Sequence, residues 1–137
     1  MNIAYEPMRD SLLGDEVIDM TVVENKAVVR ELIESVYSGN LGRIDELISP
    51  HFVDHALWID RQGLRRKLMQ LRRVFPVVNF VVEDLLGEGD RVAARVRCEC
   101  FPDATRRDAV ETIHSTSIFR LARGKVVEHW GHSDSFL

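Results

Sequence analysis

The hydrophobic pattern of the chain changes once, at Pro76, and this change constrains the fold more than any other feature of the sequence. Before Pro76, apolar residues recur at the spacing of amphipathic helices. After it, β-branched residues alternate with polar ones, and short glycine-containing turns separate the runs. Helices followed by an antiparallel meander are typical of α+β domains, in which a curved sheet wraps the helices it packs against. The 137 residues suffice to bury the core of one such domain.

Three helices are predicted before the proline. The first begins at Thr21, which with Glu24 forms the capping-box signature. Asn40 is expected to cap a second, shorter helix. Residues 52–55 are expected to be briefly extended, and the third helix is predicted to follow Gly63.

Four strands are predicted after the proline, over residues 77–86, 92–101, 112–121 and 126–134. In the third strand the larger apolar residues are odd-numbered, so we assign its odd-numbered side chains to the concave face. If the odd-numbered residues of the last strand also face inward, His129 lies across from Ser115 or Ser117. In the second strand, Cys98 and Cys100 share a face at a spacing that disfavours a disulfide, and two reduced core thiols are expected.

A curved sheet closed by helices encloses a cone, and a pocket at its open end is the expected ligand site. His129 and His55 are the candidate proton-transfer residues, because imidazole titrates near neutral pH. Asp54 and Trp58 accompany His55 in a second polar cluster. For both histidines the alternative is a hydrogen-bonded structural role. No phosphate-binding loop, serine nucleophile elbow or dinucleotide fingerprint is present, and the histidine spacing does not favour a metal site.

The charge pattern argues against nucleic acid as a partner and leaves an acidic protein partner open. A net charge of −4 argues against a nucleic-acid-binding protein. The sequence has neither a secretory n-region nor an apolar run of membrane-spanning length, so we expect a cytoplasmic protein without a membrane partner. Residues 61–73 carry six cations and no acid. A solvated helix face explains them, and docking of an acidic partner such as a carrier protein is the alternative.

Several phrases of the sequence resemble the SnoaL-like polyketide cyclase family, which belongs to the nuclear transport factor 2-like superfamily. The resemblance spans about residues 22–134 and is carried by 25–30 (NKAVVR), 52–55 (FVDH), 82–84 (VED), 87–93 (GEGDRVA), 118–121 (IFRL) and, most specifically, 124–130 (GKVVEHW). It implies an α+β cone, or barrel, of N-terminal helices packed in a curved, mostly antiparallel sheet, with a homodimer formed through the sheet. We therefore divide the chain into an N-terminal extension, 1–20, and a cone domain, 21–137.

Characterised cyclases of the family close a ring by intramolecular aldol addition without metal or cofactor, using an aspartate on the last strand. Gly131 stands where that acid is expected. The resulting hypothesis is a cofactor-independent cyclase, lyase or isomerase acting on a hydrophobic carbonyl compound, with His55 and His129 transferring protons. The residues expected to shape and polarise the pocket are Tyr37, Asp54, Trp58, Ser115 and Ser117. A non-catalytic small-molecule-binding or accessory dimerisation module of the same fold is the alternative. A steroid-isomerase-like enzyme is a third reading, weakened because the two acids of that class are missing.

Overall fold

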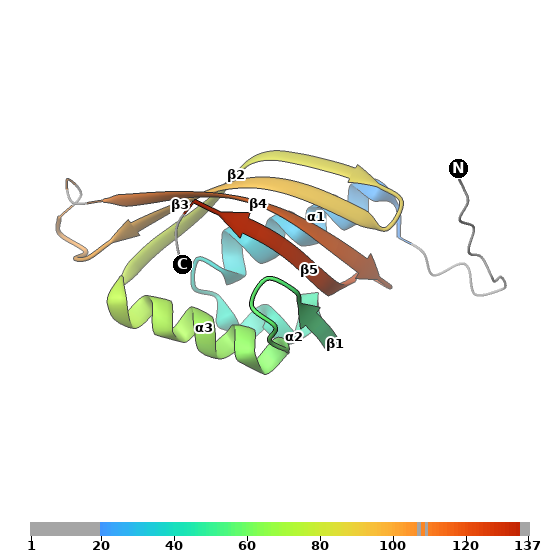
Figure 1. Ribbon diagram of the computed structural model, residues 1–137, viewed down its shortest axis with the longest axis horizontal. Helices are drawn as coiled ribbons and strands as arrows, with labels where there is room; N and C mark the ends of the chain where they lie inside the picture. Colours follow the sequence, from blue (N-terminus) through green and yellow to red (C-terminus); the bar gives the residue numbers. More distant parts are fainter. Residues whose placement is uncertain (1–19, 107, 109, 135–137) are drawn as a thin grey trace, which may run out of the picture.

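The computed structural model describes residues 20–106, 108 and 110–134. In this part of the chain the helices lie against one side of a curved five-stranded sheet (Figure 1), which confirms the α+β expectation. The predicted extension lies outside the described residues, apart from Met20. No helix among the described residues is long and apolar enough to span a membrane.

The helical half has three α-helices, α1 (Val22–Glu31), α2 (Ile44–Leu47) and α3 (Arg61–Val74), together with a π-helical segment η2 (Leu32–Val36) and a 3₁₀ turn η3 (Leu41–Arg43). The capping box at the start of α1 is confirmed: the Glu24 amide donates to the Thr21 hydroxyl at 3.1 Å, and the Thr21 amide donates to the Glu24 carboxylate at 2.9 Å.

The second predicted helix starts where expected but lacks its cap, and the start of the third is wrong. Asn40 occupies the N-cap position of η3, which leads into α2, but its side chain makes no capping hydrogen bond. The third helix begins before Gly63, because the carboxylate of Asp60 accepts from the Gly63 amide at 2.8 Å and caps α3 at Arg61.

The strands are β1 (Ile48–Asp54), β2 (Val77–Glu88), β3 (Arg91–Phe101), β4 (Glu111–Ala122) and β5 (Lys125–Ser133). Their order in the sheet is β1-β5-β4-β3-β2, antiparallel except that β1 runs parallel to β5. β1 and β2 are therefore free edges, so the sheet is an open one and the expected barrel is wrong.

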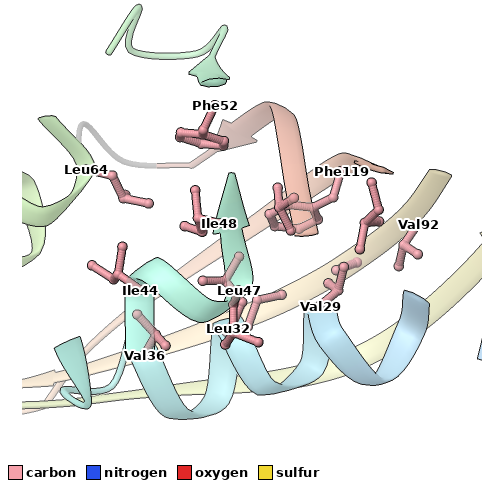
Figure 2. Close-up of a cluster of buried hydrophobic side chains, with 14 of the residues drawn as sticks. Val29, Leu32, Val36, Ile44, Leu47, Ile48, Phe52, Leu64, Val92 and Phe119 are labelled. Carbon is pink, nitrogen blue, oxygen red and sulfur yellow. The ribbon is translucent and has the colours of Figure 1, made fainter. Parts of the chain in front are cut away.

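The main core lies between the concave face of the sheet and the first helices, where Figure 2 shows Val29, Leu32 and Val36 facing Ile48 and Phe119. The assignment of odd-numbered β4 residues to the concave face is confirmed, since the apolar ones among them, Ile113, Phe119 and Leu121, are buried.

The parity expected for β5 fails at its start and holds further along. A bulge between Arg120 and Leu121 in the β4–β5 ladder pairs Leu121 with Val126, so Val126 is fully buried in the place expected for Val127. Beyond the bulge His129 faces inward, as predicted, because its ring packs against the buried Phe119 and contacts Asp54 and Ser117.

The two cysteines of β3 occupy a smaller core cluster with Val78 and Ile113. Both thiols are unpaired and buried, and their sulfur atoms are 3.5 Å apart on one face, as predicted. Burial raises the pKa of the Cys98 thiol, so it stays protonated.

Candidate functional site

A cavity of about 430 Å³ opens between α3 and the concave face of the sheet. Its walls are mostly apolar and come from α3, β2, β3 and β4, through Leu64, Leu68, Leu71, Phe80, Cys98 and Ile113. Its polar groups gather on β4, β5 and the end of β1, where Asp54, Ser115, Ser117 and His129 line the space. An apolar pocket with a few convergent polar groups is the usual form of a small-molecule site.

Asp54 is the last residue of β1 and is 2% exposed. Its carboxylate is held from both sides: Oδ1 accepts from the amides of Ala56 at 2.8 Å and Leu57 at 3.1 Å, and Oδ2 lies 3.0 Å from Nδ1 of His129. Burial alone would raise the pKa of the Asp54 carboxyl, but the contacts with the His129 ring and the two amides outweigh burial and lower it. Asp54 is therefore an ionised, fixed hydrogen-bond acceptor.

His129 connects Asp54 to Ser117. Because an ionised carboxylate can only accept, Nδ1 of the imidazole carries the proton that points at Asp54, and in the neutral ring Nε2 is left as an acceptor. The Ser117 hydroxyl lies 2.9 Å from Nε2 and donates to it. The ring also packs against Phe119, with centroids 4.8 Å apart. The result is a buried carboxylate, an imidazole and a cavity-facing hydroxyl joined in series.

Gly131 makes room for this arrangement. A Cβ atom at position 131 would lie 2.8 Å from both Cε1 and Nε2 of His129, and 3.2 Å from the Ser117 hydroxyl. A Cβ atom essentially never lies within 3.0 Å of a non-bonded atom, so any side chain here would displace the imidazole. The glycine found in place of the expected family acid is thus the residue that lets His129 reach Ser117.

Two further groups bring polarity to the cavity. Tyr37 packs edge-to-face on Phe80, and its hydroxyl makes no hydrogen bond with the described part of the chain. Burial, together with the nearby Asp54 carboxylate, raises the pKa of Tyr37, so its phenol stays protonated and can donate. Lys67 of α3 also lines the cavity and forms no ion pair within residues 20–106, 108 and 110–134.

His55 and Trp58 lie elsewhere. Neither lines the cavity. His55 Nε2 lies 2.8 Å from the carboxylate of Glu128, and its ring stacks on Trp130 with centroids 4.9 Å apart. Trp58 is 76% exposed and packs edge-to-face with the His55 ring, with centroids 5.3 Å apart. The structure therefore brings together five of the seven predicted residues. It directs the side chains of His55 and His129 to opposite faces of the sheet, although the His55 amide donates to the His129 carbonyl at 2.8 Å.

Two features of the site were missed from the sequence. The charge pattern predicts Lys67 to be one of the solvated cations of residues 61–73. Lys67 falls inside the apolar stripe of Leu64, Leu68 and Leu71, however, and that spacing is a usable signal for an inward position. The contact between Asp54 and His129 joins residues 75 positions apart and left no local trace.

The chain was compared with known protein families and solved structures. Residues 26–136 match the family model described as SnoaL-like polyketide cyclase. No curated protein matches the chain.

Solved structures similar to the chain cover most of its length. Wild-type IdmH from Streptomyces antibioticus, assigned as a candidate polyketide cyclase, is 25% identical, with 80% of this chain and 91% of that chain covered and a TM-score of 0.70. A candidate polyketide cyclase from Bacillus cereus is 22% identical, with 81% and 74% covered and a TM-score of 0.72. AclR from Streptomyces galilaeus, a candidate hydroxylase, is 22% identical, with 83% and 77% covered and a TM-score of 0.71.

Proposed function

Because the chain belongs to the SnoaL-like polyketide cyclase family, we propose that it is a cofactor-independent acid/base enzyme acting on a hydrophobic carbonyl compound in its cavity, as a cyclase, lyase or isomerase. The observation that carries the proposal is the hydrogen-bonded series from Asp54 through His129 to Ser117, which ends in a mostly apolar space. An imidazole whose Nδ1–H is held by a buried carboxylate presents its other ring nitrogen as a general base.

The proposed reaction begins with proton abstraction next to the substrate carbonyl. Nε2 of His129 takes the proton. The Ser117 hydroxyl lies 2.9 Å from Nε2, so the substrate proton approaches this nitrogen from the same side. Asp54 stabilises the imidazolium that forms, without taking the proton itself. The Tyr37 phenol or the Ser115 hydroxyl donates to the developing enolate oxygen. The imidazolium then returns its proton to the rearranged product.

In the proposed reaction His129 transfers the proton, and no group on the outer face takes part. His55, which the sequence suggested as a second base, is paired with Glu128 and stacked on Trp130, so a substrate in the cavity has no direct route to it. We propose that His55 and Trp58 stabilise the outer face of the sheet instead.

Exchange of the α-protons of 2-tetralone in D₂O, followed by NMR, tests the proposal. We expect the protein to accelerate exchange and H129A to lose about 100-fold or more of that acceleration. H55A is the comparison variant, because it removes an imidazole from the opposite face. Binding of the ketone without accelerated exchange would favour a non-catalytic binding module, and equal losses in H55A and H129A would contradict the assignment to His129.

We also propose that the chain forms a homodimer through the outer face of the sheet. A hollow of about 580 Å³ on this face is lined by Leu86, Ala93, Ile118 and Trp130, and Leu86 and Ile118 are 70% and 44% exposed. Apolar residues gathered at one hollow are typical of interaction sites. Sedimentation equilibrium should give a dimer that I118D converts to a monomer, and a monomeric wild-type chain would contradict the proposal.

A further inference from the structure

Ser117, His129 and Asp54 have the connectivity of a nucleophilic triad, in which a hydroxyl donates to an imidazole and the imidazole donates to a buried carboxylate. We propose that Ser117 is an acyl-accepting nucleophile and that the cavity hydrolyses small esters or thioesters with an apolar acyl group. This activity is separate from the acid/base reaction proposed above, in which no bond to Ser117 forms.

The geometry meets the requirements of a nucleophile. The two hydrogen bonds of the series are 2.9 and 3.0 Å, within the range expected between nucleophile, base and positioning residue. Asp54 is fixed by two backbone amides and cannot rotate away without losing both. Gly131 leaves the space next to the Ser117 hydroxyl open, and Ser117 lines the cavity.

The same cavity holds donors for an oxyanion. The Tyr37 phenol and the Lys67 ammonium line it, and neither makes a hydrogen bond or ion pair with the described residues. A protonated phenol and an unpaired cation can stabilise the charge that develops on an acyl oxygen. The acyl chain itself would lie against the leucines of α3.

The proposed hydrolysis needs water as its only co-reactant. Ser117 Oγ bonds to the acyl carbon while its proton moves to Nε2 of His129, and the carbonyl oxygen becomes an oxyanion. Collapse of this intermediate breaks the bond to the leaving alcohol or thiol, which takes the proton from Nε2. Water, deprotonated by His129, then attacks the acyl-serine, releases the carboxylic acid and restores the hydroxyl.

The test uses p-nitrophenyl butyrate with the full chain, stopped-flow detection of p-nitrophenolate and mass-spectrometric mapping of the adduct. We expect a burst of about one equivalent per chain and a butyryl group on Ser117. S117A should lose the burst, and S117C should restore acylation as a thioester. T116A is the matched control, because Thr116 is the neighbouring hydroxyl of β4 on the opposite, exposed face, and its burst should equal that of the wild type.

Asp54 acts through His129 and is a positioning residue, so its test is a pH profile. D54N should slow the burst by about 100-fold or more and change its pH dependence, because a carboxamide no longer fixes the tautomer of the ring. A change in rate with an unaltered pH profile would assign Asp54 a structural role only and overturn the triad.

Other results would overturn the proposal while leaving the acid/base function intact. These are the absence of a burst and adduct in the wild type, an adduct mapped to Ser115 or Lys67 alone, and a burst that persists in S117A. A chain that exchanges the α-protons of 2-tetralone but is not acylated is an acid/base enzyme without a nucleophile. A chain that is acylated at Ser117 but leaves the ketone unchanged fails the proposed function and retains the triad.

Discussion

Two acid–histidine dipeptides lie side by side in the sheet, Asp54-His55 at the end of β1 and Glu128-His129 on β5. They form two carboxylate–imidazole pairs, one buried on the inner face and one partly exposed on the outer face. Asp54 is the parallel partner of His129 in the sheet, so alternation sends one carboxylate and one imidazole to each face. The inner pair, Asp54 with His129, has side chains 4% and 12% exposed. The outer pair, Glu128 with His55, has side chains 25% and 23% exposed and is shared with Arg120. The two pairs contain the same chemical groups, and we expect the buried pair to contribute more to stability than the exposed one.

Removing the inner carboxylate should have the largest effect on stability. D54A leaves Nδ1–H of His129 and the amides of Ala56 and Leu57 without their acceptor in a buried place. We expect the free energy of unfolding in urea to fall by about 3 kcal/mol. E128A, the matched change in the outer pair, should lower it by about 1 kcal/mol or less. Equal losses would mean that burial does not distinguish the two pairs.

Filling the space at Gly131 should damage the inner pair alone. The added methyl of G131A would stand 2.8 Å from the imidazole of His129, so the ring must move away from Ser117. We expect a loss of about 1–3 kcal/mol in the free energy of unfolding, together with a lower rate of ketone exchange. G42A is the control, since a Cβ at Gly42 meets only the Asn40 side chain, at 3.9 Å. Unchanged exchange in G131A would show that the bond between His129 and Ser117 is not needed.

How far the sequence predicted these pairs depends on how local each determinant is. Strand alternation on β4 is local, and it placed Ser115 and Ser117 in the cavity and Phe119 in the core. The parallel pairing of β1 with β5 is not local, because residues 55–124 lie between the two strands, and the contact between Asp54 and His129 depends on it. His55 was consequently grouped with Asp54, although adjacent residues of an extended segment point to opposite faces.

The bulge near Leu121 is a second feature that the local sequence pattern does not predict. One extra residue in β5 exchanges Val127 for Val126 in the core, and nothing in the alternation of that short strand signals it. The fold class was predictable because it depends on many residues at once, whereas a site depends on the register of a few.

Acid should weaken both pairs, the inner one more. The pKa of Asp54 is lowered by its contacts with His129 and two amides against the opposing effect of burial. That of Glu128 is lowered chiefly by Arg120, with burial opposing and His55 assisting. A carboxyl whose pKa is lower in the folded state stabilises the fold at pH values above its pKa in the unfolded chain, which is about 4. This stabilisation is lost as the pH falls through the pKa of the carboxyl in the folded state.

Urea unfolding at a series of pH values below 5 measures this loss. D54N should flatten the acid dependence of the free energy of unfolding, because the group that releases its proton on folding is gone. E128Q should flatten it less, since the outer carboxylate is better solvated. A wild-type stability that does not fall between pH 4 and pH 2 would contradict both pKa directions.

The smallest expected effect is the coupling within the outer pair, and salt should separate it from the inner one. A double-mutant cycle with H55A and E128A should give a coupling of about 0.5 kcal/mol, because both side chains are partly solvated and Glu128 keeps Arg120 as a second partner. Raising the ionic strength to 1 M shortens the screening length to about 3 Å and should reduce this coupling. The corresponding cycle with D54A and H129A should give a larger coupling that salt leaves unchanged, since little solvent reaches these two side chains. Salt sensitivity of equal size in both cycles would mean that the two faces of the sheet offer these pairs the same environment.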